Sequence, residues 1–258
     1  MRTFIDFDDA PVFAVPTAAG TREGVLLDGP QGWGEFSPPA GADDALAARW
    51  LTAAMEPSTV GWPDGVRGRV PVGDGAGRAV VEVDDVDAAL SRIARHAHVG
   101  LVELVCRDAA DAGLIRRRVD VRLAVDAELL AVDPTCADVA ILRCGALGGV
   151  RRALRRAERL GMPCAVAFTG VTSIGLAADL ALAAALPEAP MLLGPVPQWL
   201  ADHDVVSVSR SLVPTDGFLP AAPMPAGPDP QRLARVAVSD PATLGRWRTL
   251  LHRAAALL

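Results

Sequence analysis

Short apolar runs alternate with helix-forming stretches from residue 69 to residue 193, and this alternation restricts the fold more than any other feature. Strands and helices that alternate in this way are typical of a parallel sheet covered by helices. The spacing of about 20 residues for each strand and helix favours a (β/α) barrel over a doubly wound sheet. We predict seven strands, at residues 69–72, 79–83, 101–105, 121–125, 139–142, 164–167 and 191–193. We predict helices between them at residues 86–97, 109–117, 149–160 and 174–185.

Residues 1–62 do not follow this alternation and predict a small α+β capping domain. Two short strands are expected at residues 24–27 and 33–36, with a Pro- and Gly-containing turn between them. A helix is expected at residues 45–55. Asp43 lies just before it, where a carboxylate accepts hydrogen bonds from the free amides of a first helical turn.

The C-terminal tail, residues 214–258, is rich in Pro and Ala before a last amphipathic helix expected at residues 241–257. An amphipathic helix buries its apolar side against another element. We therefore expect the tail to pack back on the capping domain and complete it. Residues 63–213 would then form the barrel.

The chain is acidic, with 31 carboxylate side chains, 25 basic side chains and a net charge of −6. Nucleic acid is not expected as a partner, because phosphate binding needs a concentrated positive surface. One group of arginines has the i, i+4 spacing of the solvated face of a helix: Arg151, Arg152, Arg155, Arg156 and Arg159.

We find no signal peptide pattern and no apolar run of ~20 residues, and the four cysteines form no CxxC pair. These features predict a cytoplasmic protein that does not contact a membrane.

All 25 basic residues are arginines, so the chain contains no lysine. Arginine can replace lysine on a surface, but it cannot replace lysine as a base. Its pKa lies above ~12, so the neutral fraction at pH 7 is below about 10⁻⁵. This chain therefore cannot carry out a proton transfer that depends on a neutral lysine.

Charged side chains stand at the carboxyl ends of four predicted strands, where the functional groups of a barrel are found: Glu82, Glu103, Asp126 and Arg143. Three carboxylates on successive strands would suit Mg²⁺, which prefers hard oxygen ligands. A simpler interpretation is equally open. Glu82 would belong to a solvated acidic run, and Glu103 would pair with a neighbouring arginine, because an unpaired buried charge costs several kcal/mol.

Three N-terminal segments closely resemble the capping region of the o-succinylbenzoate synthase family: residues 21–27 (TREGVLL), 32–38 (GWGEFSP) and 43–51 (DDALAARWL). Five later segments resemble the barrel of the same family: residues 116–121, 137–143, 147–151, 172–175 and 181–188. The resemblance implies the enolase superfamily, with a capping domain over a modified (β/α) barrel. It also implies a Mg²⁺-dependent syn dehydration in menaquinone biosynthesis. In that reaction 2-succinyl-6-hydroxy-2,4-cyclohexadiene-1-carboxylate, a small-molecule carboxylate, becomes 2-succinylbenzoate.

The resemblance also assigns roles to particular residues. The family's metal ligands fall on Glu82, Glu103 and Asp126, although Glu82 replaces an aspartate. The family's substrate-binding loop falls on Thr172, Ser173 and Gly175, and its paired serines are replaced by Ala167 and Phe168.

The departures from the family concern its catalytic lysines. Members carry a Lys-x-Lys strand before the first metal ligand, whereas here residues 73–77 lead from one predicted strand directly into the next. We therefore expect one strand-helix unit to be missing. The family's second lysine falls on Arg143, which can stabilise negative charge but is a poor base.

Two hypotheses follow from these departures. The chain is either an o-succinylbenzoate synthase with severely reduced activity, or a non-catalytic relative that serves as a binding or structural protein. Loss of a general base costs roughly 10² to 10⁴-fold in rate, so we expect activity to be absent or very low.

Cys106 has no base beside it in the sequence and is expected to be a structural thiol. A barrel that fails to close would leave a strand edge and favour a homodimer.

Overall fold

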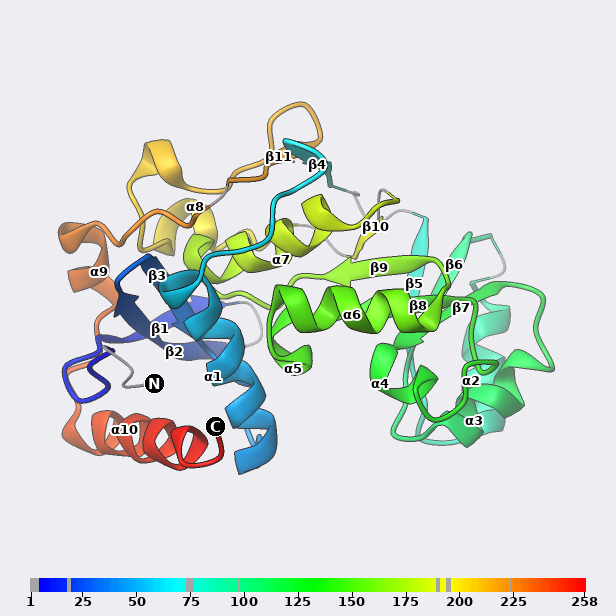
Figure 1. Cartoon of the computed structure of the whole chain (residues 1–258). Coiled ribbons are helices and arrows are strands. Elements are labelled where there is room, and N and C mark those ends of the chain that lie inside the picture. The colour runs from blue at the N-terminus through cyan, green and yellow to red at the C-terminus, as the bar shows by residue number, and fades with distance from the viewer. Residues whose placement is uncertain are drawn as a thin grey trace.

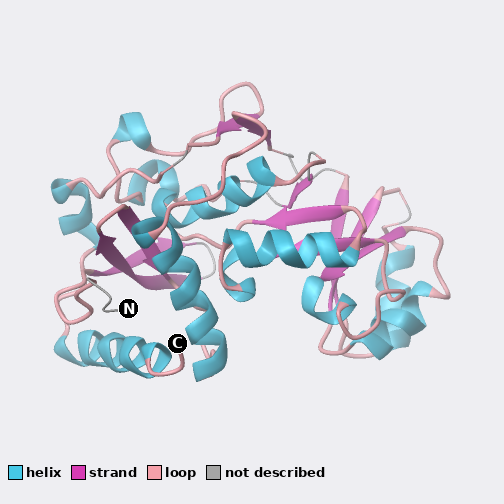
Figure 2. Ribbon diagram, viewed as in Figure 1, coloured by secondary structure: helices cyan, strands magenta, loops and turns pink. Residues whose placement is uncertain are grey.

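The computed structural model describes the following parts of the chain: residues 5–17, 20–72, 77–96, 98–188, 191–193, 196–222 and 224–258. Its strands form two main sheets that lie apart (Figure 2). The antiparallel capping sheet and the C-terminal helix occupy one end of the molecule, and a parallel sheet with its helices occupies the other (Figure 1).

The capping sheet has the order β1-β2-β3 and is formed by β1 (Val12–Thr17), β2 (Gly20–Gly29) and β3 (Gly32–Phe36). Helix α1 (Asp44–Thr59) follows, and the Asp43 side chain accepts a hydrogen bond from the Leu46 amide at 2.7 Å, as predicted. Strand β1 was not predicted.

Helix α1 lies very close to strand β3. A Cβ built on Gly34 would come within 1.8 Å of the Ala54 carbonyl oxygen, so only glycine allows this approach.

The parallel sheet has six strands in the order β10-β9-β8-β7-β6-β5. They are β5 (Arg78–Glu82), β6 (Leu101–Val105), β7 (Arg122–Asp126), β8 (Val139–Leu142), β9 (Cys164–Ala167) and β10 (Met191–Leu193). The helices between them are α2 (Val86–Ala94), α3 (Ala109–Arg116), α4 (Ala127–Leu130), α5 (Cys144–Leu147), α6 (Val150–Leu160) and α7 (Ser173–Ala185). The α/β class and the parallel sheet agree with the prediction.

The first predicted barrel strand does not join this sheet. Residues Arg69–Pro71 form β4, which pairs antiparallel with β11 (Phe218–Pro220) in a separate two-stranded sheet. The prediction of seven strands in one sheet is therefore wrong for the described residues. Pro71 has no amide hydrogen, and a proline is tolerated at the edge of a sheet but not within one. Among the described residues, β5 and β10 end the sheet without pairing with each other.

The two faces of the parallel sheet differ in what covers them. One face packs against the helices in the largest apolar cluster, which includes Val81, Val102 and Leu104. The other face, called the inner face below, carries the alternate residues of the same strands. A small buried cluster covers part of it: Leu101, Ala124, Val139, Ile141, Ala165 and Ala167. Charged side chains at the carboxyl ends of the strands lie next to this cluster.

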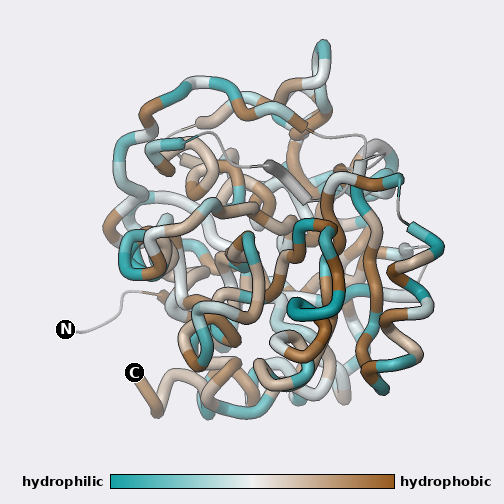
Figure 3. Tube along the Cα trace, turned by 90° about the vertical axis from the view of Figure 1, so that its right-hand side faces the viewer, coloured by the Kyte–Doolittle hydropathy of each residue, from teal (hydrophilic) through white to brown (hydrophobic). Residues whose placement is uncertain are grey.

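The tail contains α8 (Leu200–His203), the 3₁₀ helix η1 (Val208–Arg210), β11, α9 (Pro230–Val236) and α10 (Pro241–Ala255). Helix α10 packs along α1, and its Trp247 and Leu251 are buried with Leu51 (Figure 1). The trace alternates between hydrophilic and hydrophobic stretches along its helices (Figure 3). Within the part of the chain that the structure describes, no helix has both the length and the apolarity needed to cross a membrane.

Candidate functional site

The candidate site lies on the inner face of the parallel sheet. Strand register places Val80 of β5 opposite Glu103 of β6, and Glu103 opposite Ala124 of β7, so these three side chains share one face. Asp126 ends β7 two residues after Ala124, and Arg143 follows β8 directly. Parallel pairing therefore brings together three of the four charged residues predicted at the strand ends: Glu103, Asp126 and Arg143.

Arg143 joins the two carboxylates. Its Nε donates to Asp126 Oδ1 at 2.7 Å, and its Nη2 donates to Glu103 Oε1 at 2.9 Å. Glu103 is buried, with 4% of its surface exposed. A buried carboxylate must be paired or hydrogen-bonded to remain charged, and Arg143 meets that need.

A second arginine reaches the same carboxylate from the start of β5. Arg78 Nη2 lies 2.7 Å from Glu103 Oε2, and only 18% of the Arg78 side chain is exposed. The contact is an ion pair without the geometry of a hydrogen bond. Arg78 Nε and Glu103 Oε2 therefore have no hydrogen-bond partner in the described part of the chain. Two guanidinium groups and two carboxylates make the site electrically neutral.

The arginine at this site is held in its charged form. Burial acts to lower the pKa of Arg143, but the ion pairs and hydrogen bonds with Asp126 and Glu103 outweigh it and raise that pKa above its ordinary value. The guanidinium therefore stays protonated at any physiological pH, and Arg143 can offer positive charge only.

Glu82 does not complete a cluster of three carboxylates. Its side chain is exposed, it lies opposite Val105 in the register, and its carbonyl oxygen accepts a hydrogen bond from Arg92 Nη1 at 2.6 Å. Among the described residues, no group of three His, Cys, Asp or Glu side chains is placed to hold a metal ion. The remaining two carboxylates already bind guanidinium groups. This donor set does not fit Mg²⁺, which needs several free oxygen ligands.

The residues of the predicted substrate-binding loop make hydrogen bonds with other parts of the protein. Thr172 Oγ1 donates to Glu35 Oε2 at 2.6 Å, and Ser173 Oγ donates to Asp204 Oδ2 at 2.5 Å. Both hydroxyl residues are buried, and a Cβ on Gly175 would lie 2.4 Å from Glu35 Oε1. Thr172 directly precedes α7, and Ser173 and Gly175 lie in its first turn, where their contacts are with other parts of the protein.

Glu35 and Asp204 were not predicted as important, and neither was Asp179. Asp179 lies in α7 and is fully buried, where it accepts hydrogen bonds from the Thr169 amide at 2.7 Å and the Gly170 amide at 3.1 Å. The sequence does carry a signal for two of them. Glu35 stands in an apolar strand and Asp179 in an apolar helix, and such charges are retained only where they have partners.

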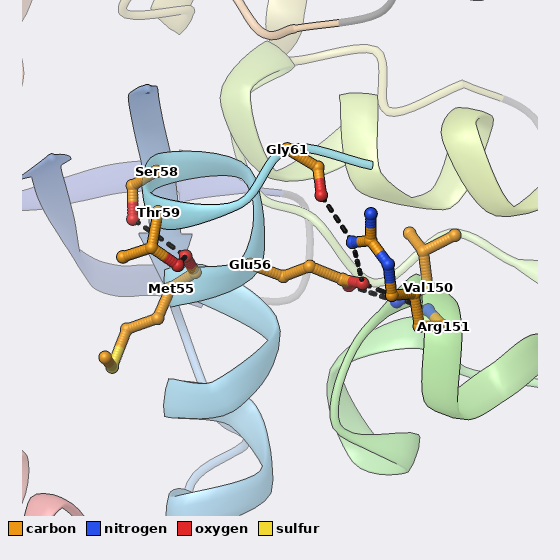
Figure 4. A network of polar contacts seen from close by, with 7 residues as sticks. All are labelled: Met55, Glu56, Ser58, Thr59, Gly61, Val150 and Arg151. Carbon is orange, nitrogen blue, oxygen red and sulfur yellow. Dashed lines mark hydrogen bonds and ion pairs between the residues drawn. The ribbon is translucent and has the colours of Figure 1, made fainter. Parts of the chain in front are cut away.

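A further buried carboxylate, Glu56 of α1, caps the N-terminus of α6 (Figure 4). It accepts hydrogen bonds from the Val150 amide at 2.6 Å and the Arg151 amide at 3.1 Å, and it forms an ion pair with Arg151 Nη1 at 3.0 Å. Gly149 precedes the helix at φ 106°, and a Cβ there would lie 2.4 Å from Glu56 Oε2. A helix N-terminus attracts anions, and here the protein's own carboxylate fills that position.

The contact between the capping domain and the loop before α7 is nearly closed. The cavity there has a volume of about 20 Å³ and is lined by Glu35, Trp50, Gly145 and Gly170, among others. That volume holds about one water molecule, whereas ligand pockets usually measure about 300–1,000 Å³.

Cys106, just after β6, is expected to resist alkylation. Burial, followed by the nearby Cys136 and Asp108, raises the pKa of its thiol to about 12. Only the thiolate reacts, and at pH 8 that form is about one part in 10⁴. Iodoacetamide treatment at pH 8, followed by peptide mass spectrometry, should leave Cys106 unmodified in the folded protein. The same treatment in urea is the control and should modify it. Rapid labelling of the folded protein would contradict a half-buried thiol that stays protonated at pH 8.

Comparison with known proteins identifies the family. Residues 18–58 match the family model described as Enolase N-terminal domain-like. The o-succinylbenzoate synthase of Thermobifida fusca (strain YX) is 35% identical over 295 residues, covering 91% of this chain and 90% of that protein. The o-succinylbenzoate synthase of Mycobacterium leprae (strain TN) is 30% identical, covering 77% of this chain and 76% of its own length.

Solved structures agree in fold. The 2-chloromuconate cycloisomerase from Rhodococcus opacus 1CP superposes with a TM-score of 0.67 at 15% identity, covering 92% of this chain and 99% of that one. The muconate lactonizing enzyme from Pseudomonas fluorescens gives a TM-score of 0.65 at 14% identity, with the same coverage. At this identity the likeness concerns the fold alone. Together with the 35% identity to the Thermobifida fusca protein, it shows that the chain belongs to the o-succinylbenzoate synthase family of the enolase superfamily.

Proposed function

We propose that this family member has lost o-succinylbenzoate synthase chemistry and serves as a non-catalytic binding or structural protein. One observation carries the proposal: Arg143 is bonded to both Glu103 and Asp126. Those two carboxylates are the ligands that the resemblance assigns to Mg²⁺. Because guanidinium groups are paired with both carboxylates, the net charge of the cluster is zero. Such a cluster attracts a divalent cation only weakly.

The absence of lysine supports the same conclusion. The dehydration begins with removal of a proton from the carbon next to a carboxylate, a step for which the family uses lysine as base. Arg143 stands at the position of one lysine and stays protonated. Besides Arg143, the described site contains Arg78 and two carboxylates that are already paired with arginines.

The short connection between β4 and β5 also supports it. Only residues 72–77 separate the two strands, whereas a strand-helix crossover takes at least about 10–12 residues. The alignment with the Thermobifida fusca protein extends over 295 positions, and this whole chain has 258 residues. The relative therefore has segments with no counterpart here, consistent with a lost strand-helix unit.

The direct test is turnover of 2-succinyl-6-hydroxy-2,4-cyclohexadiene-1-carboxylate by the purified chain, with Mg²⁺ and with EDTA. We expect no 2-succinylbenzoate above the uncatalysed rate in either condition, because neither a base nor a metal site is available. Titration calorimetry with Mg²⁺ should show no saturable heat. Circular dichroism of the same sample must show a folded protein.

The Thermobifida fusca protein, assayed in parallel, is the positive control for substrate quality. The variant Arg143→Lys separates the two causes of inactivity, because it supplies one lysine and leaves the shortened chain unchanged. We expect it to remain inactive. Metal-dependent product formation by the unmodified chain would contradict the proposal and support the alternative, a slow synthase that uses a base other than lysine.

A further inference from the structure

Strand β5 ends the parallel sheet. On one side it pairs with β6, and within the described residues no strand pairs with its other side. On the paired side the Gly77 carbonyl accepts from the Gly100 amide at 3.1 Å, and the Val83 amide donates to the Val105 carbonyl at 2.9 Å. The odd-numbered residues of this segment therefore direct their backbone groups toward β6.

Alternate residues of a strand direct their backbone groups to opposite edges, so Arg78, Val80 and Glu82 face the free edge. One of these groups has a partner, because the Glu82 carbonyl accepts from Arg92 Nη1. Both backbone groups of Val80, at the centre of the strand, remain available in the described part of the chain. An edge of this kind is a template for pairing with another strand.

Large apolar side chains are exposed beside this edge. Val80 is 50% exposed and Val105 is 47% exposed, and both lie on the inner face of the sheet. Glu82, opposite Val105 in the register, is also exposed. Two exposed valines next to an unpaired edge form a small apolar surface, and pairing of the edge with another strand would bury part of it.

The sequence of β5 is complementary to itself. It reads Arg-Ala-Val-Val-Glu, so antiparallel pairing of two copies about a two-fold axis at Val80 sets Arg78 opposite Glu82 of the second copy. Opposite charges that face each other across strands are favourable, whereas like charges are not. Arg78 pairs with Glu103 through Nη2, and one guanidinium can contact two carboxylates at once, as Arg143 does with Asp126 and Glu103.

We propose that two copies of this chain associate through β5 and form one continuous sheet across a two-fold axis. The two Val80 residues exchange both backbone hydrogen bonds at the axis, and two Arg78–Glu82 pairs flank them. The occupant of the edge is a second copy, because the match of charges at equal distances from Val80 is a property of a strand that meets itself. This inference does not depend on the absence of catalysis.

Disulfide trapping tests the register. At a directly opposed antiparallel pair of this type the Cα atoms lie about 5.5 Å apart, within the range that a disulfide spans. Val80→Cys is therefore expected to give a covalent dimer under mild oxidation. Val105→Cys is the matched control, because this valine is equally exposed but lies on the next strand, away from the axis. It should give no dimer above the background of the native cysteines.

Light scattering of the unmodified chain tests the association itself. We expect twice the chain mass of 26.8 kDa, and we expect Glu82→Arg, which sets arginines opposite each other, to shift the protein to the monomer mass. Circular dichroism must show that both proteins are folded. A monomer at all concentrations, equal trapping at positions 80 and 105, or a dimer that survives Glu82→Arg would each overturn the proposal.

Discussion

Replacing Glu35 by alanine is expected to lower the free energy of unfolding by about 4 kcal/mol. Glu35 is buried and accepts four hydrogen bonds: from the Val171 amide at 2.7 Å, the Thr172 amide at 2.8 Å, Thr172 Oγ1 at 2.6 Å and Ser37 Oγ at 2.6 Å. Alanine leaves these buried donors without an acceptor. Urea unfolding followed by circular dichroism measures the loss.

Glu158→Ala is the matched control, because Glu158 is an exposed glutamate on α6 and its loss should change the free energy of unfolding by less than about 0.5 kcal/mol. Glu35→Gln should fall between the two, since the amide keeps one acceptor oxygen and loses the other. If Glu35→Ala unfolded at the same urea concentration as Glu158→Ala, the Glu35 contacts would not hold the capping domain to the loop before α7.

The strands of the parallel sheet could be predicted because burial on both faces leaves a strong local signal. Residues 101–105, 139–142 and 164–167 were predicted with the bounds that the structure has. The pairing of β4 with β11 could not be predicted. It joins segments more than 140 residues apart, and no local pattern in either segment specifies the other.

The candidate site was predictable in part for the same reason. Parallel strands bring their carboxyl ends to one edge, so the proximity of Glu103, Asp126 and Arg143 follows from correct strand positions. The pairing of Glu103 with an arginine was one of two interpretations, and the ion pairs with Arg78 and Arg143 confirm it. The exposure of Glu82 agrees with the same interpretation, which placed this residue in a solvated acidic run.

The contacts of Glu35 lay beyond sequence reasoning, although its position in an apolar strand signalled a partner. Its hydrogen bonds reach Val171 and Thr172, 136 and 137 residues away. The resemblance to the family assigned Thr172 to the substrate instead. In the structure the Thr172 hydroxyl donates a hydrogen bond to Glu35. A residue that matches a family motif therefore connects strand β3 to the start of α7.

The stability of the protein is expected to fall as pH rises from about 4 to about 7, because of Asp179. Burial is the largest influence and raises the pKa of this carboxyl from 3.8 to about 7, although hydrogen bonds from Thr169 and Gly170 act in the opposite direction. In this pH interval the folded state holds the proton and the unfolded state releases it. The stabilising contribution of protonated Asp179 is therefore complete below pH 3.8 and lost by pH 7. The shift corresponds to roughly 4 kcal/mol.

Asp179→Asn isolates this effect from every other titration in the chain. Asparagine is neutral and of the same shape, and its carbonyl oxygen can still accept from the amides of Thr169 and Gly170. Urea unfolding of both proteins at pH 5, 6, 7 and 8 gives the difference in the free energy of unfolding. We expect that difference to move in favour of the variant by about 2 kcal/mol between pH 5 and pH 7 and to change little above pH 7. Parallel curves across this range would mean that Asp179 is ionised in the folded protein throughout, with Thr169 and Gly170 fully offsetting its burial.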